Sequence, residues 1–325
     1  MFQLLIDKLK ANPKKIVFTE GTDPRILEAA SRLLTEKIMT PILVGKVSDV
    51  KAAAEKCGFD ITGAEIIDPD TFDRLGEMVD AFCEIRRSKG VTPEEARKTL
   101  SQGNYFGTML VKIGYADALL GGATYSTADT VRPALQIIKT KPGNNIVSSC
   151  FILVRPRDNG ENEIIAMGDC AINIKPTEDE LVEIATETEA CARIFGIDPK
   201  VAFLSYSTLG SGKGEDVDKM RNACAKCKAA NPNMVVDGEF QFDAAVDSRV
   251  ADTKCPGNPV AGKANTFIFP DINAGNIGYK IAQRLGGFDA YGPILLGLNA
   301  PINDLSRGCN GLEVYCMAII TAALA

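Results

Sequence analysis

The chain has 325 residues, with 36 Lys and Arg against 42 Asp and Glu, and a formal net charge of −6. This length predicts two domains or two lobes, because single domains commonly contain about 100–200 residues. An apolar content of 46% and a charged content of 24% exclude a disordered or collagen-like chain. The acidic balance also argues against nucleic-acid binding, which needs a broad basic surface.

Strand-like and helix-like segments alternate along the chain. Helical patterns open at Asp23-Pro24 and near Phe72, restart at the capping box Thr92-Pro93-Glu94-Glu95, and close the chain. The expected strands lie at 15–19, 41–45, 116–122, 201–207, 234–240, 265–271 and 293–299. Two further apolar runs, 146–155 and 163–174, flank a polar turn and predict a hairpin. These segments predict an α/β fold with mostly parallel sheets. In such folds the site lies outside the carboxyl ends of the strands, often in a cleft between lobes.

The sequence contains no His. This excludes a Ser–His or Cys–His catalytic pair and a mixed Cys/His zinc site, so proton transfer falls to a carboxylate, Lys, Tyr, Cys or the substrate. The ten Cys are scattered and the start of the chain shows no secretory signal, which predicts free thiols in a reducing cytoplasm. The longest apolar run, 316–325, is about half of the ~20 residues that span a bilayer, so we expect no membrane segment.

Two short motifs look like binding sites but do not meet the full sequence patterns of such sites. Gly210–Gly214 lacks the leading Gly and the Ser/Thr of a phosphate loop, and Glu215 stands where a dinucleotide fingerprint needs its third Gly. What remains is a flexible turn with free N–H groups, for which a plain turn and an anion contact are equal alternatives. Cys224-x-x-Cys227 lacks the second pair that a structural zinc site needs, so we interpret it as two ordinary helix thiols.

The stretch 271–280 follows an expected strand and precedes a helix that contains Arg284. Its two Gly allow a sharp turn and a close approach to a ligand, and a helix N-terminus favours an anion. Asn276 and Lys280 are therefore binding candidates. Arg284 taken alone is more typical of a solvated surface charge.

A second candidate segment, 125–133, follows the strand expected at 116–122. It combines the hydroxyls of Ser126 and Thr127 with Arg132, whose guanidinium suits a phosphate. The alternative is a helix start in which one of the two hydroxyls is the cap. Arg86, near the end of the helix expected from Phe72, has no independent signal.

The strongest local signal is the stretch 301–309, between the last expected strand and the closing helix. Ser306-Arg307-Gly308 supplies a hydroxyl, a fixed positive charge and a permissive turn. With no His to activate it, Ser306 is better placed as a hydrogen-bond donor than as a nucleophile, and Arg307 would hold a phosphate or a developing oxyanion. Glu313 lies in the first turn of the helix that follows.

Together these segments resemble the phosphate acetyl- and butyryltransferase family. The resemblance extends from EGTDPRILEAA near the start to the last helix, and it rests on YFGTMLVKIGYADALLGGATYSTADTVRPALQIIKT, VAFLSYSTLGSGKG, DGEFQFDAAV, PVAGKANTFIFPDINAGNIGYKIAQRLGG and GPILLGLNAPINDLSRGC. Motifs of this length are highly specific. The SRGC and STADTVRPALQI segments look more like the acetyl members than the butyryl members.

The resemblance implies reversible acetyl transfer between coenzyme A and inorganic phosphate, with acetyl phosphate formed. Coenzyme A and acetyl-CoA are then substrates, and no tightly bound cofactor or metal is expected. A homodimer, metabolic coupling to acetate kinase, and a two-lobed three-layer αβα fold with its site in the interdomain cleft are also implied. Because family members return to the first domain at their C-terminus, we expect domain I at 1–143 plus 296–325 and domain II at 144–295.

The resemblance also carries residue roles. Ser306 and Arg307 match a Ser-Arg pair that stabilises the transition state and holds phosphate. Among the substrate-binding arginines, Arg86 is preferred to its neighbour because it lies four residues before a Gly. The expected substrate-binding residues are Arg86, Arg132, Arg284, Ser126, Thr127, Asn276, Lys280 and Cys309.

This chain departs from the family pattern at two positions. In the proposed family mechanism an Asp seven residues after the Ser deprotonates the coenzyme A thiol, and the thiolate attacks the acetyl phosphate carbonyl in a ternary complex. Glu313 stands at that position here. Glu is one methylene longer, and a ~1 Å misplacement can cost on the order of a hundredfold in rate. Tyr125 replaces a family His before the Ser-Thr pair, which indicates that this His is not obligatory.

Three alternatives are kept beside acetyl transfer. The first is butyryl transfer by the same machinery. The second is an NAD(P)-dependent decarboxylating dehydrogenase, which needs a metal-binding cluster of Asp and usually a Lys/Tyr pair that we cannot assemble from this sequence. The third is a non-catalytic acyl-CoA-sensing domain of the same fold, which would bind coenzyme A without turnover.

Overall fold

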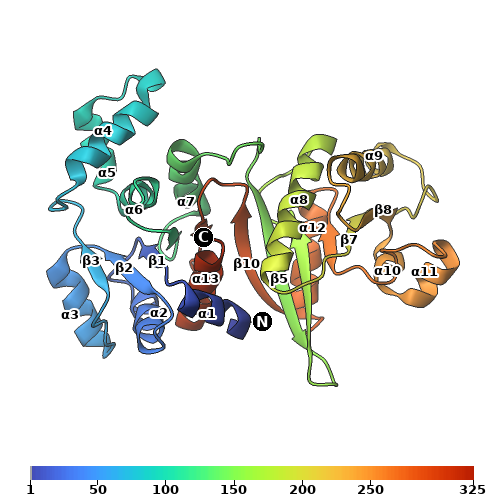
Figure 1. Cartoon of the computed structure of the whole chain (residues 1–325), viewed down its shortest axis with the longest axis horizontal. Coiled ribbons are helices and arrows are strands. Elements are labelled where there is room, and N and C mark those ends of the chain that lie inside the picture. Colours follow the sequence, from blue (N-terminus) through green and yellow to red (C-terminus); the bar gives the residue numbers. More distant parts are fainter. Residues whose placement is uncertain (1) are drawn as a thin grey trace. The chain divides into compact units, whose positions relative to one another are not determined.

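A computed structural model describes residues 2–325 (Figure 1). The chain divides into two compact units. The first unit comprises 2–142 together with 298–325, and the second comprises 143–297.

The first unit is built on a five-stranded, fully parallel sheet of order β11-β4-β1-β2-β3. Its strands are β1 (Lys15–Phe18), β2 (Thr40–Val44), β3 (Glu65–Ile67), β4 (Ala118–Gly121) and β11 (Ile302–Asp304). Its helices are α1 (Phe2–Ala11), α2 (Pro24–Thr35), α3 (Val47–Cys57), α4 (Leu75–Ile85), α5 (Pro93–Leu100), α6 (Gly103–Lys112), α7 (Thr127–Pro133) and α13 (Gly311–Ala323). Figure 1 shows this sheet between α1–α3 on one side and α4–α6 on the other, so the unit has three layers.

The second unit holds a six-stranded mixed sheet of order β10-β5-β6-β9-β7-β8. Its strands are β5 (Ser148–Pro156), β6 (Asn162–Gly168), β7 (Val201–Leu204), β8 (Val236–Phe240), β9 (Thr266–Ile268) and β10 (Asp289–Leu296). Its helices are α8 (Glu178–Ile194), α9 (Glu215–Ala230), α10 (Phe242–Val246), α11 (Ser248–Lys254) and α12 (Ile272–Arg284). The expected hairpin is the antiparallel pair β5–β6, and the other pairs are parallel except β10–β5. The predicted α/β class with mostly parallel sheets is confirmed.

The short strand β7 shows how this sheet buries both of its faces. Ala202 and Leu204 pack in a core with residues of α10 and α11, whereas Val201 and Phe203 pack in a second core with residues of α8 and α9. Successive side chains of a strand point to opposite faces, so a strand covered on both faces is apolar throughout. This is why such strands were predictable from short apolar runs.

Strand β11 was not predicted, although it positions the most informative segment of the sequence. Its polar residues do not form the apolar run by which the other strands were predicted. Asn303 is nevertheless fully buried, and it donates a hydrogen bond of 2.9 Å to Thr321 in α13. The strand pairs with β4 and ends at Asp304. Ser306 and Arg307 therefore leave the carboxyl end of a parallel strand.

Candidate active site

The carboxyl edge of the first unit's sheet gathers two of the predicted segments. Strands β1, β4 and β11 are neighbours and parallel, so their carboxyl ends meet at one edge. The Leu305 N–H donates to the Gly121 carbonyl over 2.7 Å, which joins the loop after β11 to the end of β4. The structure thus brings Ser126 and Thr127, after β4, to the same edge as Ser306.

Asp304 links helix α7 to the end of β11. Its buried carboxylate accepts hydrogen bonds of 2.6 Å from the hydroxyls of Thr127 and Thr130. A Cβ at Gly122, whose φ is +96°, would collide with this carboxylate, so glycine is required there. The Thr127 hydroxyl, expected to contact substrate, is therefore held by a carboxylate of the chain itself. Burial raises the pKa of Asp304, and the two hydroxyls act in the opposite direction.

The Ser306 turn presents its polar groups to solvent. The Cys309 N–H donates to the Ser306 carbonyl over 2.9 Å, and the Gly308 N–H donates to the Ser306 Oγ over 3.2 Å. Ser306 and Arg307 are exposed, whereas Cys309 is buried and burial raises the pKa of its thiol. Within residues 2–325 the Arg307 guanidinium has no hydrogen-bond or ion-pair partner. A hydroxyl and an unpaired guanidinium on adjacent residues can bind an anion.

Glu313 lies in the first turn of α13, as expected, and the structure gives it a capping role. Its carboxylate accepts the Asn310 N–H over 2.9 Å, and the Asn310 side chain accepts the Glu313 N–H over 2.9 Å. This reciprocal pair is a capping box. It occupies Oε2 and leaves Oε1 of an exposed carboxylate for other contacts.

Arg86 differs from its neighbour Arg87 in the way that a binding role requires. Helix α4 ends at Ile85, and a short 3₁₀ turn carries the chain to Gly90. Arg87 forms an ion pair with Glu84 on the surface. Arg86 has no such partner among the described residues, so its charge stays available for a ligand.

Ser126 and Arg132 converge on Asp129, a residue that the sequence analysis did not weigh. The Ser126 hydroxyl donates to the Asp129 carboxylate over 2.7 Å, and Arg132 lies 3.7 Å from the same carboxylate. The Ser126 side chain makes no cap hydrogen bond to the α7 backbone. Arg132 and Asp129 are both exposed, so this weak pair leaves the guanidinium accessible to an anion.

A second polar cluster at the same edge was missed by the sequence analysis. Glu20 accepts hydrogen bonds from the Thr19 hydroxyl at 2.8 Å and from the Thr124 N–H at 2.9 Å. The Thr19 hydroxyl also lies 2.7 Å from the hydroxyl of Tyr125. Burial raises the pKa of both Glu20 and Tyr125. Tyr125, which replaces the family His, is thus part of a partly buried network.

The second unit holds the remaining candidates on α12, and one expectation about them is wrong. The stretch 271–280 is not a glycine turn, because α12 begins at Ile272 and is capped by the Asp271 side chain. Gly275 serves close packing instead, since a Cβ there would collide with the Asp169 carbonyl. The Asn276 amide donates to the Cys170 carbonyl over 2.9 Å.

The charges of α12 remain accessible. Lys280 and Arg284 are exposed, and neither forms an ion pair with a described residue. Lys280 lies 5.8 Å from the ring centroid of Tyr279. These two cations, four residues apart, lie along one side of the helix with Asn276.

The glycine-rich turn after β7 is closed by its own hydrogen bonds. The Gly210 N–H donates to buried Glu239 over 2.7 Å, and the Gly212 N–H donates to the Ser207 hydroxyl over 2.8 Å. Because these amides are occupied, the structure favours the plain turn of the two alternatives. Cys224 and Cys227 are buried on α9, in agreement with ordinary helix thiols.

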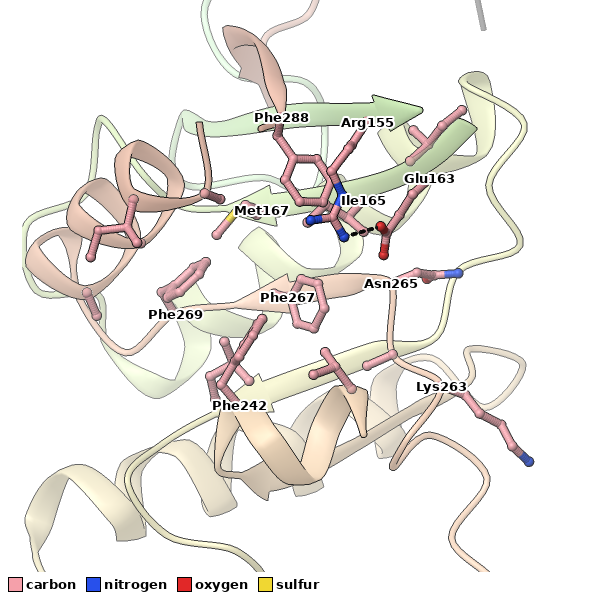
Figure 2. A pocket seen from close by; sticks show the side chains of 18 of the residues that line it. Arg155, Glu163, Ile165, Met167, Phe242, Lys263, Asn265, Phe267, Phe269 and Phe288 are labelled. Carbon is pink, nitrogen blue, oxygen red and sulfur yellow. Dashed lines mark hydrogen bonds and ion pairs between the residues drawn. The ribbon is translucent and has the colours of Figure 1, made fainter. Parts of the chain in front are cut away.

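The second unit also contains a large groove, of about 980 Å³, between α12 and α10 (Figure 2). Figure 2 shows Arg155 between Phe288, 4.3 Å from its ring centroid, and Glu163, 2.6 Å away. Five aromatic rings line the groove: Tyr206, Phe242, Phe267, Phe269 and Phe288. None of the predicted site residues lines it, so it is a separate feature of this unit.

All ten thiols are free. Across residues 2–325, no three His, Cys, Asp or Glu side chains come together in a way that could hold a metal ion. None of the helices in the described part of the chain is long and apolar enough to cross a membrane.

Asp304 and Asp129 both accept hydrogen bonds from hydroxyls of the segment 126–132. Their contributions to stability should depend on pH in opposite directions. Burial raises the pKa of Asp304 above its ordinary 3.8, whereas the Ser126 hydroxyl lowers that of Asp129 below the same value. A raised carboxyl pKa gives stability that is complete below pH 3.8 and is lost as pH rises through the folded-state pKa. A lowered pKa gives stability that is present above pH 3.8 and is lost as pH falls.

Urea unfolding of Asp304→Asn and Asp129→Asn across pH ~3–7 tests this. The stability of Asp304→Asn should improve relative to the unmodified chain as pH rises from 3.8. The stability of Asp129→Asn should improve relative to the unmodified chain as pH falls below 3.8. Two difference curves that slope in the same direction would contradict the environments described here.

Comparison with known proteins agrees with this geometry. The phosphate acetyl/butaryl transferase family model matches residues 1–322. The phosphate acetyltransferase of Bacillus subtilis (strain 168) is 50% identical over 325 residues, covering 100% of this chain and 99% of that protein. The one from Staphylococcus epidermidis (strain ATCC 12228) is 51% identical over 330 residues, with 100% and 98% covered.

Solved structures show the same similarity. A phosphotransacetylase from Streptococcus pyogenes has a TM-score of 0.94 and 52% identity, with 99% of this chain and 97% of that chain covered. The EutD phosphotransacetylase from Staphylococcus aureus has a TM-score of 0.93 and 49% identity with the same coverage. A branched-chain phosphotransacylase from Enterococcus faecalis, 19% identical with a TM-score of 0.67, shares the fold. The chain therefore belongs to the phosphate acetyl/butaryl transferase family.

Proposed function

We propose that this chain catalyses reversible acetyl transfer between coenzyme A and inorganic phosphate, acetyl-CoA + phosphate = coenzyme A + acetyl phosphate. The observation that carries the proposal is the exposed Ser306-Arg307 pair, whose guanidinium has no partner among residues 2–325. The relatives at about half identity named phosphate acetyltransferase support acetyl over butyryl as the acyl group. Coenzyme A, acetyl phosphate and phosphate are then substrates, and the reaction needs no tightly bound cofactor.

In the direction of acetyl-CoA formation, the coenzyme A thiol gives its proton to a carboxylate and the thiolate attacks the acetyl carbon. A C–S bond forms, the carbonyl becomes a tetrahedral oxyanion, and the bond from carbon to the phosphate oxygen then breaks. The Ser306 hydroxyl donates to the oxyanion, and Arg307 stabilises the charge on the departing phosphate. Glu313 is the proposed base, acting through the oxygen that the capping box leaves unoccupied.

The remaining candidates are proposed to bind the anionic groups of the substrates. Arg86 and Arg132 in the first unit and Arg284 with Lys280 in the second supply accessible positive charge. Ser126, Thr127 and Asn276 are each held by other groups of the chain, which supports a role in shaping the site beside any substrate contact. Cys309 is proposed to line the site from a buried position.

We further propose the surroundings in which the protein acts. Acetyl phosphate is the substrate of acetate kinases, so metabolic coupling to such an enzyme follows from the proposed reaction. Ten free thiols support a reducing cytoplasm. The division into compact units supports domain I at 1–143 plus 296–325 and domain II at 144–295.

A homodimer is proposed from the surface of the second unit. Three large aliphatic side chains, Ile277 and Ile281 of α12 and Leu285 directly after it, are 57%, 53% and 85% exposed and form one stripe at intervals of four residues. Of the thirteen residues of α12, all of them described, Gly275 alone is buried. The stripe lies beside the groove of Figure 2, which Ile281 helps to line. A two-fold axis can therefore place the stripe of each copy against the groove of the other.

The proposed reaction is tested by following thioester absorbance with acetyl phosphate and coenzyme A, with butyryl phosphate in parallel. We expect turnover with acetyl phosphate, and a loss of about 10²–10³-fold in Arg307→Ala because one charge-stabilising donor is removed. Arg87→Ala, which removes an exposed arginine paired with Glu84, is the matched control and should keep near-normal rates. A folded chain that binds coenzyme A but turns over neither substrate would instead be an acyl-CoA-sensing domain. Normal rates in Arg307→Ala would remove Arg307 from the site.

Glu313→Gln separates the capping role from the catalytic role. Gln also fits the third position of a capping box, so the thermal unfolding midpoint should stay within a few degrees. The loss of a proton acceptor should lower kcat by about 10²–10⁴-fold. Glu313→Asp, which installs the family residue, should retain turnover. An undiminished rate in Glu313→Gln would place the base elsewhere.

The dimer proposal is tested by sedimentation at micromolar concentration. Ile281→Asp should dissociate the protein to monomers, because it buries a charge in an apolar interface. Val47→Asp, at a side chain of the first unit that is 42% exposed, should remain dimeric. A monomeric unmodified protein, or a dimer that Ile281→Asp leaves intact, would exclude this surface as the interface.

A further inference from the structure

Arg25 lies in the first turn of α2, beside its N-cap Asp23, and all five of its guanidinium N–H groups have acceptors. Two of them grip the Asp23 carboxylate as a fork, with Nε at 2.9 Å and Nη2 at 2.7 Å. The second Nη2 hydrogen points to the Ala123 carbonyl at 2.8 Å. Nη1 donates to the carbonyls of Arg307 at 2.9 Å and of Cys309 at 3.3 Å.

These acceptors belong to three different loops at the carboxyl edge of the sheet. Asp23 lies between β1 and α2, Ala123 follows β4, and Arg307 and Cys309 follow β11. One side chain therefore joins the backbone segments that leave three neighbouring parallel strands.

The Ser306–Cys309 turn has few other connections to the rest of the unit. Its own hydrogen bonds are internal, and Leu305 joins it to β4 on one side while Asn310 begins α13 on the other. Arg25 holds the carbonyl of Arg307, whereas the Arg307 side chain has no partner in the described part of the chain. Arg25 thus fixes the backbone from which the Arg307 guanidinium projects.

The compensated charge of Arg25 makes this side chain compatible with a neighbouring anion site. The side chains of Arg25 and Asp23 are only 26% and 10% exposed, and the two charges compensate each other. Arg25 therefore does not compete with Arg307 for a phosphate, although it lies next to it in space. The fork is matched to a carboxylate in a way that a Lys ammonium is not, because Lys has three donors on a single nitrogen.

We propose that Arg25 is a positioning residue that sets the place of the Ser306-Arg307 pair by holding three loop backbones at once. The inference rests on the acetyl transfer proposed above. Arg25 acts through its hydrogen bonds to the Arg307 and Cys309 carbonyls, and its own charge is compensated by Asp23. A displacement of ~1 Å in reacting groups can cost on the order of a hundredfold in rate. Loss of the hydrogen bonds from Arg25 to the three loops should have an effect of this size.

The experiment compares Arg25→Lys and Arg25→Ala with the unmodified chain by kcat, by KM for both substrates, and by thermal unfolding. Arg74→Lys is the matched control, because Arg74 makes the same two-pronged contact, 2.7 Å for each bond, to Glu77, and its guanidinium makes no hydrogen bond to a loop backbone within residues 2–325. We expect about a hundredfold loss of kcat in Arg25→Lys, smaller changes in KM, and a near-normal rate in Arg74→Lys. Added guanidinium should restore part of the turnover of Arg25→Ala, since it can occupy the vacated position.

The outcomes separate this inference from the proposed function. An inactive unmodified chain overturns both. An active unmodified chain with a folded Arg25→Lys within threefold of its kcat overturns the positioning role alone. A kcat loss that guanidinium does not restore, accompanied by a large fall in the unfolding midpoint, would mark Arg25 as a structural residue. If Arg25→Ala does not fold, the kcat and KM of Arg25→Lys, which keeps the charge next to Asp23, still test the positioning role.

Discussion

The candidate site depends on hydrogen bonds from side chains to the backbones of loops that leave parallel strands. Parallel neighbours cannot be joined by a tight hairpin, so the loops at their carboxyl ends come from distant parts of the chain. Arg25 is 98 residues from Ala123 and 282 residues from Arg307, yet it contacts the carbonyls of both. Asp304, at the end of β11, adds a side-chain link to α7 by accepting hydrogen bonds from two threonine hydroxyls. The sheet gathers the loops at one edge, and these side chains define their relative positions.

Acidic groups lie among the same loops, although the proposed substrates are anions. Burial raises the pKa of Glu20 and Asp304, so their ionised forms are opposed by the surroundings and supported by the hydroxyls that donate to them. Asp23 is different, because the Arg25 side chain lowers its pKa. Each carboxylate is thus satisfied by donors of the chain itself. The hydroxyls and N–H groups that hold these carboxylates already have acceptors in the chain, whereas the unpaired arginines and Lys280 keep their donors accessible to an anion.

The limits of prediction from sequence follow from the same physics. Apolar strands such as β7 were predictable because both of their faces are buried. Strand β11 was not, because its polar Asn303 is buried and donates a hydrogen bond to a helix that comes later in the chain. Gly275 was interpreted as a turn residue, but it is glycine because the Asp169 carbonyl packs against the helix. The capping box at Glu313 could have been predicted from the sequence, since Asn310 and Glu313 have the required spacing. The contacts of Arg25 were not, because backbone carbonyls carry no signature in the sequence.

The distribution of paired and unpaired arginines explains how a chain of net charge −6 can bind anions. Arg74 and Arg87 have carboxylate partners three residues away on their own segments, and such exposed pairs contribute little to stability. Arg86, next to Arg87, has no partner in the described chain, and neither has Arg307. An anion that approaches either of them displaces only water. It does not have to compete with a carboxylate of the protein. Under the proposed function, local pairing, more than the total charge, therefore determines which arginines can bind a phosphate.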